Sequence, residues 1–241
     1  MKVHIFIPCF IDQLYPQTGM NMVKVLEKAC CEVIYNPKQT CCGQPAYNAG
    51  FTDEARPVCR KFLHDFSEAQ YIVTPSASCG GFIRNYYHDV FAEDADLALA
   101  KSVSSRVYEF TEFLTEVLRM EHFGAELHAK AVYHSSCASL RECKLGSGPL
   151  KLLEKVKGLE LQPLLQAETC CGFGGTFAVK FDDISAAMAD QKIQHAKESG
   201  AELIISTDQS CLMHLEGRIK ARGESIQTMH IADVLASGWE H

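Results

Sequence analysis

The chain has 241 residues, of which 47% are hydrophobic and 22% charged, and this ordinary globular composition argues against a disordered protein. Its formal net charge is −7 at pH 7, and the sequence contains no cluster of Lys and Arg. Both features argue against electrostatic binding of nucleic acid. The apolar stretch at residues 3–11 is too short to span a bilayer and lacks the charged leader and cleavage site of a signal peptide, so we expect a cytoplasmic protein with no direct membrane insertion.

Short runs rich in β-branched residues alternate with amphipathic stretches along the chain. In chain order, the pattern predicts a strand at 2–8, a helix at 18–28, a strand at 32–35, a helix at 53–67, a strand at 71–74, a helix at 108–120, a joint at 121–129, strands at 130–135 and 159–161, a helix at 182–199 that ends before Gly200, and a strand at 203–206. Strands that alternate with helices indicate an α/β protein with parallel sheets.

Cysteine is the outlier of the composition, since the chain has twelve. Eight of them recur in the same order at offsets of 128 to 132 residues: Cys9, Cys41, Cys42 and Cys79, then Cys137, Cys170, Cys171 and Cys211. Both adjacent pairs are followed by glycine. We therefore predict two pseudo-repeated domains, at residues 1–120 and 128–241, each a short parallel sheet flanked by helices.

Each repeated cysteine follows the carboxyl end of a predicted strand. Loops at the carboxyl ends of parallel strands meet in one crevice, so we expect the four thiols of each half to converge. In a reducing cytosol, clustered cysteines bind metal or carry out redox chemistry more often than they form structural disulfides.

Soft thiolate ligands favour an iron–sulfur centre or zinc. Ligands from three distant loops are less typical of a structural zinc site, which usually takes closely spaced CxxC pairs. The glycines that follow the pairs, notably at 172–175, let the backbone turn tightly and present N–H groups to sulfur. Both halves can hold metal, only one can, or the two can share one centre.

Two other classes of function stay open. One is a zinc-binding structural or interaction module that uses the same thiols. The other is a thiol–disulfide oxidoreductase in which Cys41–Cys42 or Cys170–Cys171 cycles, because vicinal disulfides are strained and reducible.

We expect structural roles for the four cysteines outside the repeat and for two histidines near the repeated cysteines. Four cysteines have no partner in the repeat and are expected to be buried as small hydrophobic side chains: Cys30, Cys31, Cys59 and Cys143. His134 and His214 each lie three residues from a repeated cysteine. Each can be a metal ligand or a proton relay, but we expect both to be satisfied histidines near a helix. No general base or flavin site is visible, so no catalytic residue is assigned.

The segments CCGQPAYNAG, CCGFGGTFAVK and CLMHLEGRIK resemble the cysteine-rich CCG iron–sulfur proteins, and nearly the whole chain is similar to the lactate utilisation protein A family. This resemblance implies an iron–sulfur electron-transfer subunit of a three-protein complex that oxidises L-lactate to pyruvate. The partners it implies are two further subunits, one of which is also an iron–sulfur protein. Lactate oxidation releases two electrons and a 4Fe–4S cluster usually carries one, so further redox centres are expected in those partners.

More distant relatives are the CCG-domain subunit of heterodisulfide reductase and the iron–sulfur subunits of glycerol-3-phosphate dehydrogenase and glycolate oxidase. The full motif of the heterodisulfide reductase subunit ends in CxxC and has five cysteines. In this chain Ser76 and Asp208 stand where the first cysteine of that terminal pair would be. The four cysteines left in each half still suffice for an ordinary 4Fe–4S cluster, and the resemblance implies one or two such clusters.

Overall fold

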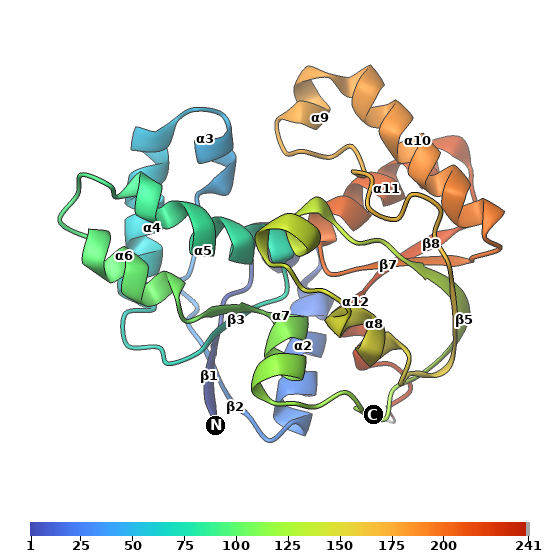
Figure 1. Ribbon diagram of the computed structural model, residues 1–241, viewed down its shortest axis with the longest axis horizontal. Helices are drawn as coiled ribbons and strands as arrows, with labels where there is room; N and C mark the ends of the chain where they lie inside the picture. The colour runs from blue at the N-terminus through green and yellow to red at the C-terminus, as the bar shows by residue number, and fades with distance from the viewer. Residues whose placement is uncertain (240–241) are drawn as a thin grey trace.

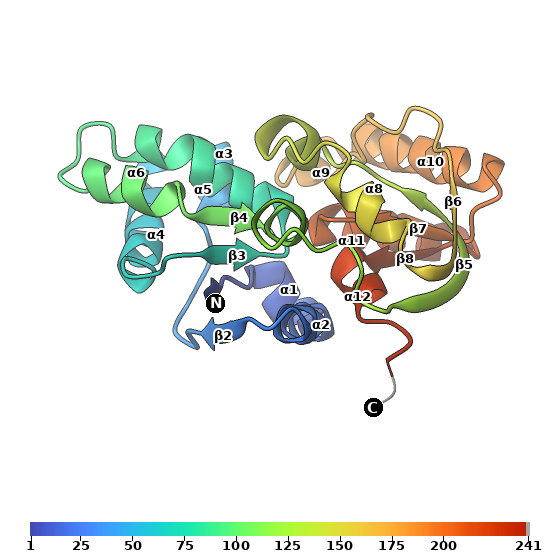
Figure 2. The same ribbon diagram turned by 60° about the horizontal axis from the view of Figure 1, so that its bottom comes forward.

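The computed structural model describes residues 1–239 and consists of two α/β halves that lie side by side (Figure 1). Figure 2 shows the N-terminal half in blue to green and the C-terminal half in yellow to red, each with its own sheet. Among these described residues, no helix combines the length and the apolar character that a membrane span requires.

The first half contains four strands, with helices between them. Its elements are β1 (Lys2–Ile5), α1 (Cys9–Leu14), α2 (Pro16–Lys28), β2 (Glu32–Tyr35), α3 (Gln44–Asn48), α4 (Thr52–Asp65), β3 (Ile72–Thr74), α5 (Ala77–Val90), α6 (Leu97–Ser104), β4 (Val107–Glu109), α7 (Phe110–Glu112) and the π-helical turn η1 (Phe113–Val117).

The second half repeats this order of elements with small differences. Its elements are β5 (Glu126–Tyr133), the π-helical turn η2 (Ala138–Glu142), α8 (Gly148–Leu153), β6 (Lys157–Gln162), α9 (Phe177–Lys180), α10 (Asp182–Glu198), β7 (Leu203–Ser206), α11 (Gln209–Arg222), β8 (Gln227–His230) and α12 (Ile231–Leu235).

Both sheets are entirely parallel and have the same strand order, β2-β1-β3-β4 in the first half and β6-β5-β7-β8 in the second. The chain direction across the sheet therefore reverses between β1 and β3, and likewise between β5 and β7. In open parallel sheets a crevice forms at the carboxyl ends of the strands on either side of such a reversal. The predicted α/β fold with two parallel sheets is confirmed.

Local sequence signals explain how several helices begin and end. Pro16 is the first residue of α2, where its missing N–H and fixed φ are well tolerated. Helix α10 begins with Asp182 and Asp183, whose carboxylates suit the positive end of the helix dipole. It ends just before Gly200, whose φ of +76° is the left-handed conformation typical of a helix end.

Several elements differ from the sequence-based expectation; for example, the strand expected at 2–8 ends at Ile5, and helices α5 and α11 were not predicted. The helix expected at 108–120 is wrong at its start, because Val107–Glu109 pairs with β3 as strand β4 and only 110–117 is helical. The joint expected at 121–129 is too long, since β5 begins at Glu126. The sequence pattern does not predict strand β8, whose Gln227–His230 segment has a single apolar side chain to signal it.

The two halves share a hydrophobic core. One cluster contains Val3 and Phe110 of the first half together with Leu203 and Leu235 of the second, all buried. Helix α2 packs against α12 and α7 against α8, while α5 packs against η2 and α1 against α11. Because these pairs correspond under the repeat, the contact between the halves has an approximate two-fold symmetry, as in an isologous dimer.

Candidate metal centres

The eight repeated cysteines lie at the carboxyl edges of the two sheets, as the repeat predicts. In each half one cysteine follows the first strand at the start of a helical turn, two lie in the loop after the second strand, and one lies in the first turn of the helix after the third strand. They are Cys9, Cys41, Cys42 and Cys79 in the first half, and Cys137, Cys170, Cys171 and Cys211 in the second.

All eight of these cysteines line one cavity of about 610 Å³ between the halves. The expected convergence of thiols from distant loops is therefore present within each half, and the two sets also face a common space. The lining contains none of the four unrepeated cysteines. Cys31, Cys59 and Cys143 are buried as expected, but the expectation fails for Cys30, which is exposed at a left-handed turn after α2.

In the first half, the Sγ atoms of Cys42 and Cys79 are 3.4 Å apart, and both side chains are buried. Cys9 and Cys41 are half-buried beside them. The four thiols of this half are therefore gathered closely enough to form one metal-binding set.

The second half has the same graded burial, with Cys171 and Cys211 buried, Cys170 half-buried and Cys137 exposed. Hydrogen bonds from the Cys137 and Cys171 thiols hold the pKa of Cys170 far below its usual value, while the pKa of Cys137 is raised. The first half behaves alike, since thiols of its neighbours lower the pKa of Cys41. Each set thus stabilises one cysteine as a thiolate among neighbouring thiols. The thiolate is the form of cysteine that binds metal.

Backbone groups also favour negative charge on these sulfurs. The N–H of Gly43 donates to Cys41 Sγ at 3.4 Å, and that of Gly172 donates to Cys170 Sγ at 3.3 Å. Cys79 and Cys211 lie in the first turns of α5 and α11, where the helix dipole stabilises anions. Of the glycines at 172–175, Gly172 is the one whose N–H is seen to face a cysteine sulfur among the described residues.

The two positions that depart from the five-cysteine motif meet each other. Ser76 and Asp208 form an isolated antiparallel β-bridge across the boundary between the halves. The carboxylate of Asp208 accepts hydrogen bonds from the backbone N–H of Ser78 at 2.9 Å and from its hydroxyl at 3.1 Å. Burial raises the pKa of Asp208. In this chain the two positions join the halves.

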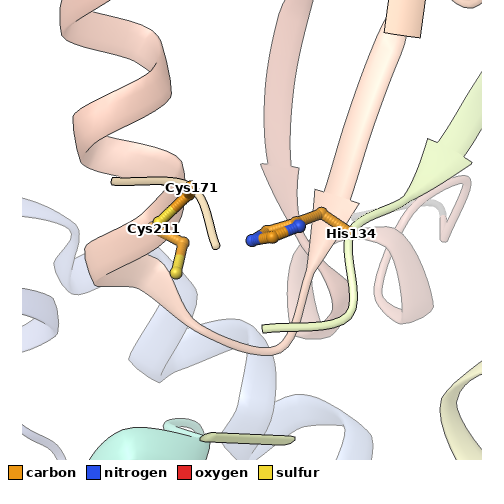
Figure 3. Close-up of side chains that lie close together, drawn as sticks. All are labelled: His134, Cys171 and Cys211. Carbon is orange, nitrogen blue, oxygen red and sulfur yellow. The ribbon is translucent and has the colours of Figure 1, made fainter. Parts of the chain in front are cut away.

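The expectation for His134 is wrong. His134 is fully buried at the end of β5, and within residues 1–239 neither ring nitrogen has a hydrogen-bond partner. A ring nitrogen lies with the Cys171 and Cys211 sulfurs in a group whose atoms are all within 4.8 Å of one another (Figure 3). Burial lowers the pKa of His134 to about 3, so the imidazole is neutral and able to bind metal. His214 behaves as expected, since its ring contacts the Ser185 hydroxyl at 3.2 Å.

A buried lysine lies near the same sulfurs. The ammonium group of Lys192 donates to the carbonyl oxygens of Gln166 and Ala167 at 2.7 and 3.2 Å, in the loop that leads to the second cysteine pair. Burial lowers its pKa, and the nearby Cys170, Cys171 and Cys211 act in the opposite direction. A positive charge beside these thiols fits a centre with several thiolate ligands.

The residues present fit a thiolate-bound metal group. Each half offers four sulfurs from three loops, hydrogen-bond donors to sulfur, and a burial gradient that exposes one side of the set to the cavity. Orphaned nitrogens on His134 add an observation that points in the same direction. Soft sulfur ligands suit an iron–sulfur cluster as well as zinc.

Comparison with known proteins agrees with the repeat. Residues 3–84 and 131–216 each match the family described as cysteine-rich domain. Lactate utilization protein A of Geobacillus kaustophilus is 46% identical over 235 residues, which cover 98% of this chain and 98% of that protein. The chain belongs to the lactate utilization protein A family. Another member, lactate utilization protein A 2 of Bacillus cereus, is 41% identical over 239 residues, or 99% of each chain.

A solved structure supports the fold alone. A hypothetical protein from Helicobacter pylori superimposes with a TM-score of 0.60 at 10% identity, and the match covers 100% of this chain and 49% of that chain. The chain thus spans about half the length of that protein. Its likeness in fold carries no information about chemistry, which comes from the sequence family and from the thiol sites.

Proposed function

We propose that the chain is an iron–sulfur electron-transfer subunit of an L-lactate-oxidising complex. The observation that carries this proposal is the arrangement of eight repeated cysteines as two sets of four around one cavity. Membership of a family named for lactate utilization supplies the substrate, and soft thiolate ligands supply the kind of centre.

In this proposal Cys9, Cys41, Cys42 and Cys79 hold one 4Fe–4S cluster, and Cys137, Cys170, Cys171 and Cys211 hold a second. Such a cluster supplies one-electron transfer when bound. The chain's own residues hold the sulfurs in place, exclude water from the inner thiols, and direct the Gly43 and Gly172 N–H groups at sulfur. Hydrogen bonds to sulfur raise the reduction potential of such centres.

The oxidation of lactate to pyruvate is proposed for the complex as a whole. We propose two further subunits, one also an iron–sulfur protein, which together supply the remaining redox centres and the lactate site. We also propose that the complex works in the cytoplasm, where a reducing environment keeps the thiols available.

Anaerobic purification of the full chain tests the type of centre. We expect a brown protein with broad visible absorption, with iron and acid-labile sulfide in equal amounts, and a paramagnetic resonance signal after reduction. A colourless protein with stoichiometric zinc would contradict the proposal and favour a zinc module. A metal-free protein whose thiol count rises with reductant would instead favour thiol–disulfide chemistry.

Two neighbouring buried cysteines give a matched pair of variants. Cys42 lines the cavity, whereas the Cys59 thiol donates to the carbonyl oxygen of Cys42 at 3.5 Å and does not line it. We expect Cys42→Ser to lose about half of the bound iron, because one of two sets loses a ligand. Cys59→Ser should keep the iron of the wild type, since a hydroxyl can donate to the same carbonyl. Equal iron contents in the two variants would contradict the ligand assignment.

The proposed role in lactate oxidation is tested with the two proposed partner subunits present. With the two other subunits present, lactate should bleach the visible absorption of this chain within the time of turnover. Bleaching that fails with lactate but succeeds with a chemical reductant would remove this chain from the lactate pathway while leaving its clusters in place.

A further inference from the structure

The two sets of cysteines are equivalent by sequence, but their surroundings are not. The offset of 128 that relates Cys9 to Cys137 also relates Phe6 to His134. In the first half, Phe6 is buried and packs edge-on against Phe62, with ring centroids 5.0 Å apart. The second half therefore has an imidazole where the first has a hydrocarbon ring.

The partner of Phe6 is exchanged as well. Helices α4 and α10 are equivalent in the repeat and begin at Thr52 and Asp182, an offset of 130 residues. With this offset, Lys192 of α10 is equivalent to Phe62 of α4. Lys192 is 1% exposed. An aromatic pair behind the first set of thiols is thus replaced by an imidazole and an ammonium group behind the second. Burying a polar side chain costs free energy. The presence of two polar side chains at positions that are aromatic in the first half therefore indicates a charged or metal-bearing group beside them that they stabilise.

The position of His134 identifies what it contacts. Figure 3 shows its ring pointing toward Cys171 and Cys211, which come from a different loop and a different helix. The nitrogen and both sulfurs lie within 4.8 Å of one another. The three donor atoms therefore lie close enough together to belong to the ligand set of one metal centre.

The ring has no competing role within residues 1–239. Both nitrogens lack a hydrogen-bond partner, and a buried donor or acceptor left unpaired destabilises the folded protein. An iron of a cluster held beside the Cys171 and Cys211 thiolates would satisfy the nitrogen that faces them. Neutral imidazole is a common metal ligand.

We propose that His134 is a ligand of the second metal centre, which therefore has a mixed imidazole–thiolate donor set while the first centre is bound by thiolates alone. The proposal rests on the proposed function, because it requires a metal centre in the second half. In this proposal His134 takes the place of one of the four thiolates assigned above to the second cluster, which removes one negative charge and raises the reduction potential. The second centre is then the one of the pair that is reduced first.

Pulsed paramagnetic resonance on the full chain tests this ligand directly. The protein is produced anaerobically with ¹⁵N in the imidazole of histidine and then reduced stepwise. We expect a ¹⁵N coupling of the strength of a directly bound nitrogen in the signal that appears first. The His134→Phe variant, which copies Phe6, should lose the coupling, and the potential of that centre should fall.

His214→Gln is the matched control, because His214 lies in the same half and is occupied by Ser185. This control should keep the coupling and the potential. Iron in both halves without a histidine coupling in the wild type would overturn the proposed ligand and leave the proposed function standing. A chain without iron would overturn both. The wild-type measurement decides the matter even if His134→Phe fails to fold.

Discussion

The glycine after each cysteine pair holds a backbone conformation that other residues rarely adopt. Gly172 has a φ of +96°, and a Cβ there would lie 2.4 Å from the carbonyl oxygen of Ser185. Gly175 also has a positive φ, of +61°, but a Cβ there would meet no atom within 4 Å. The loop that carries Cys171 therefore depends on Gly172 for both its turn and its close packing on α10.

Substituting alanine for Gly172 and for Gly175 should lower the free energy of unfolding by different amounts. We expect Gly172→Ala to lower the free energy of unfolding by roughly 2–4 kcal/mol, because left-handed strain and overpacking add. Gly175→Ala should cost about 1 kcal/mol from strain alone. Urea denaturation of both variants measures the difference. Equal losses would show that the contact with Ser185 does not constrain the loop.

A buried carboxyl gives the fold a pH dependence. Burial raises the pKa of Glu109 from 4.5 to about 8, although its Oε2 accepts from the N–H groups of Thr111 and Glu112 at the start of α7. Because the pKa is raised by folding, the contribution of Glu109 to stability is full below about pH 4.5 and is lost as pH rises through 8. Each unit of this shift corresponds to about 1.4 kcal/mol.

Glu109→Gln should therefore flatten the fall in stability between pH 5 and pH 8.5 by a few kcal/mol, since glutamine can accept the same hydrogen bonds without a charge. Thermal unfolding across this range measures the effect. Glu154→Gln, at an exposed position, should keep the wild-type dependence on pH. A Glu109→Gln profile parallel to that of the wild type would show that Glu109 is not the group responsible.

Individual ligand candidates were predictable from the sequence because the repeat singled them out. The eight cysteines recur at nearly constant offset, and strand ends in a parallel sheet meet at one edge. His134 could not be chosen in this way, since a lone histidine has no counterpart in the other half. The signal that could have found it is its alignment with Phe6, a polar residue at a position that the repeat makes apolar and buried.

At the scale of elements, the start of α11 joins the two halves through Asp208. Its carboxylate accepts from Ser78 at the start of α5 and from the Ser210 hydroxyl at 2.8 Å. Asp208→Ala would leave the Ser78 N–H without its acceptor at the boundary, so we expect a loss of about 1–3 kcal/mol in the free energy of unfolding. Ser210→Ala removes one hydroxyl and should cost less than about 1 kcal/mol. Chemical denaturation of the pair of variants tests this, and a larger loss in Ser210→Ala would contradict it.

Element types were predictable where a strand is buried and apolar, as for Leu203–Ser206, whose bounds are as expected. Strands β4 and β8 were not, because their sequences, VYE and QTMH, lack a continuous apolar run. Their extended form comes from pairing with β3 and β7, and such pairing leaves little trace in local sequence. A helical pattern that continues into Phe110–Val117 masked the strand at Val107–Glu109.

At the scale of the whole molecule, the repeat predicts two similar halves but not how they face each other. That arrangement comes from long-range contacts across the boundary, such as Thr18 with Asp233 at 2.8 Å and the shared apolar core. Its consequence is that both sets of thiols open on one cavity. Under the proposed function, two redox centres held this way would be neighbours, and electrons could pass between them without leaving the chain.

Neighbouring centres should also interact magnetically. When the protein is fully reduced, we expect a paramagnetic resonance spectrum broadened by coupling between two spins, because dipolar coupling falls steeply with distance and both sets line the same cavity. Cys171→Ser, which disables the second set, should give the narrower spectrum of the first centre alone, and Cys42→Ser should do the converse. The control is the half-reduced wild type, in which one spin is present and the broadening should be absent. If the spectrum of the fully reduced wild type equals the sum of the two single-variant spectra, the centres do not interact and the shared cavity does not bring them together.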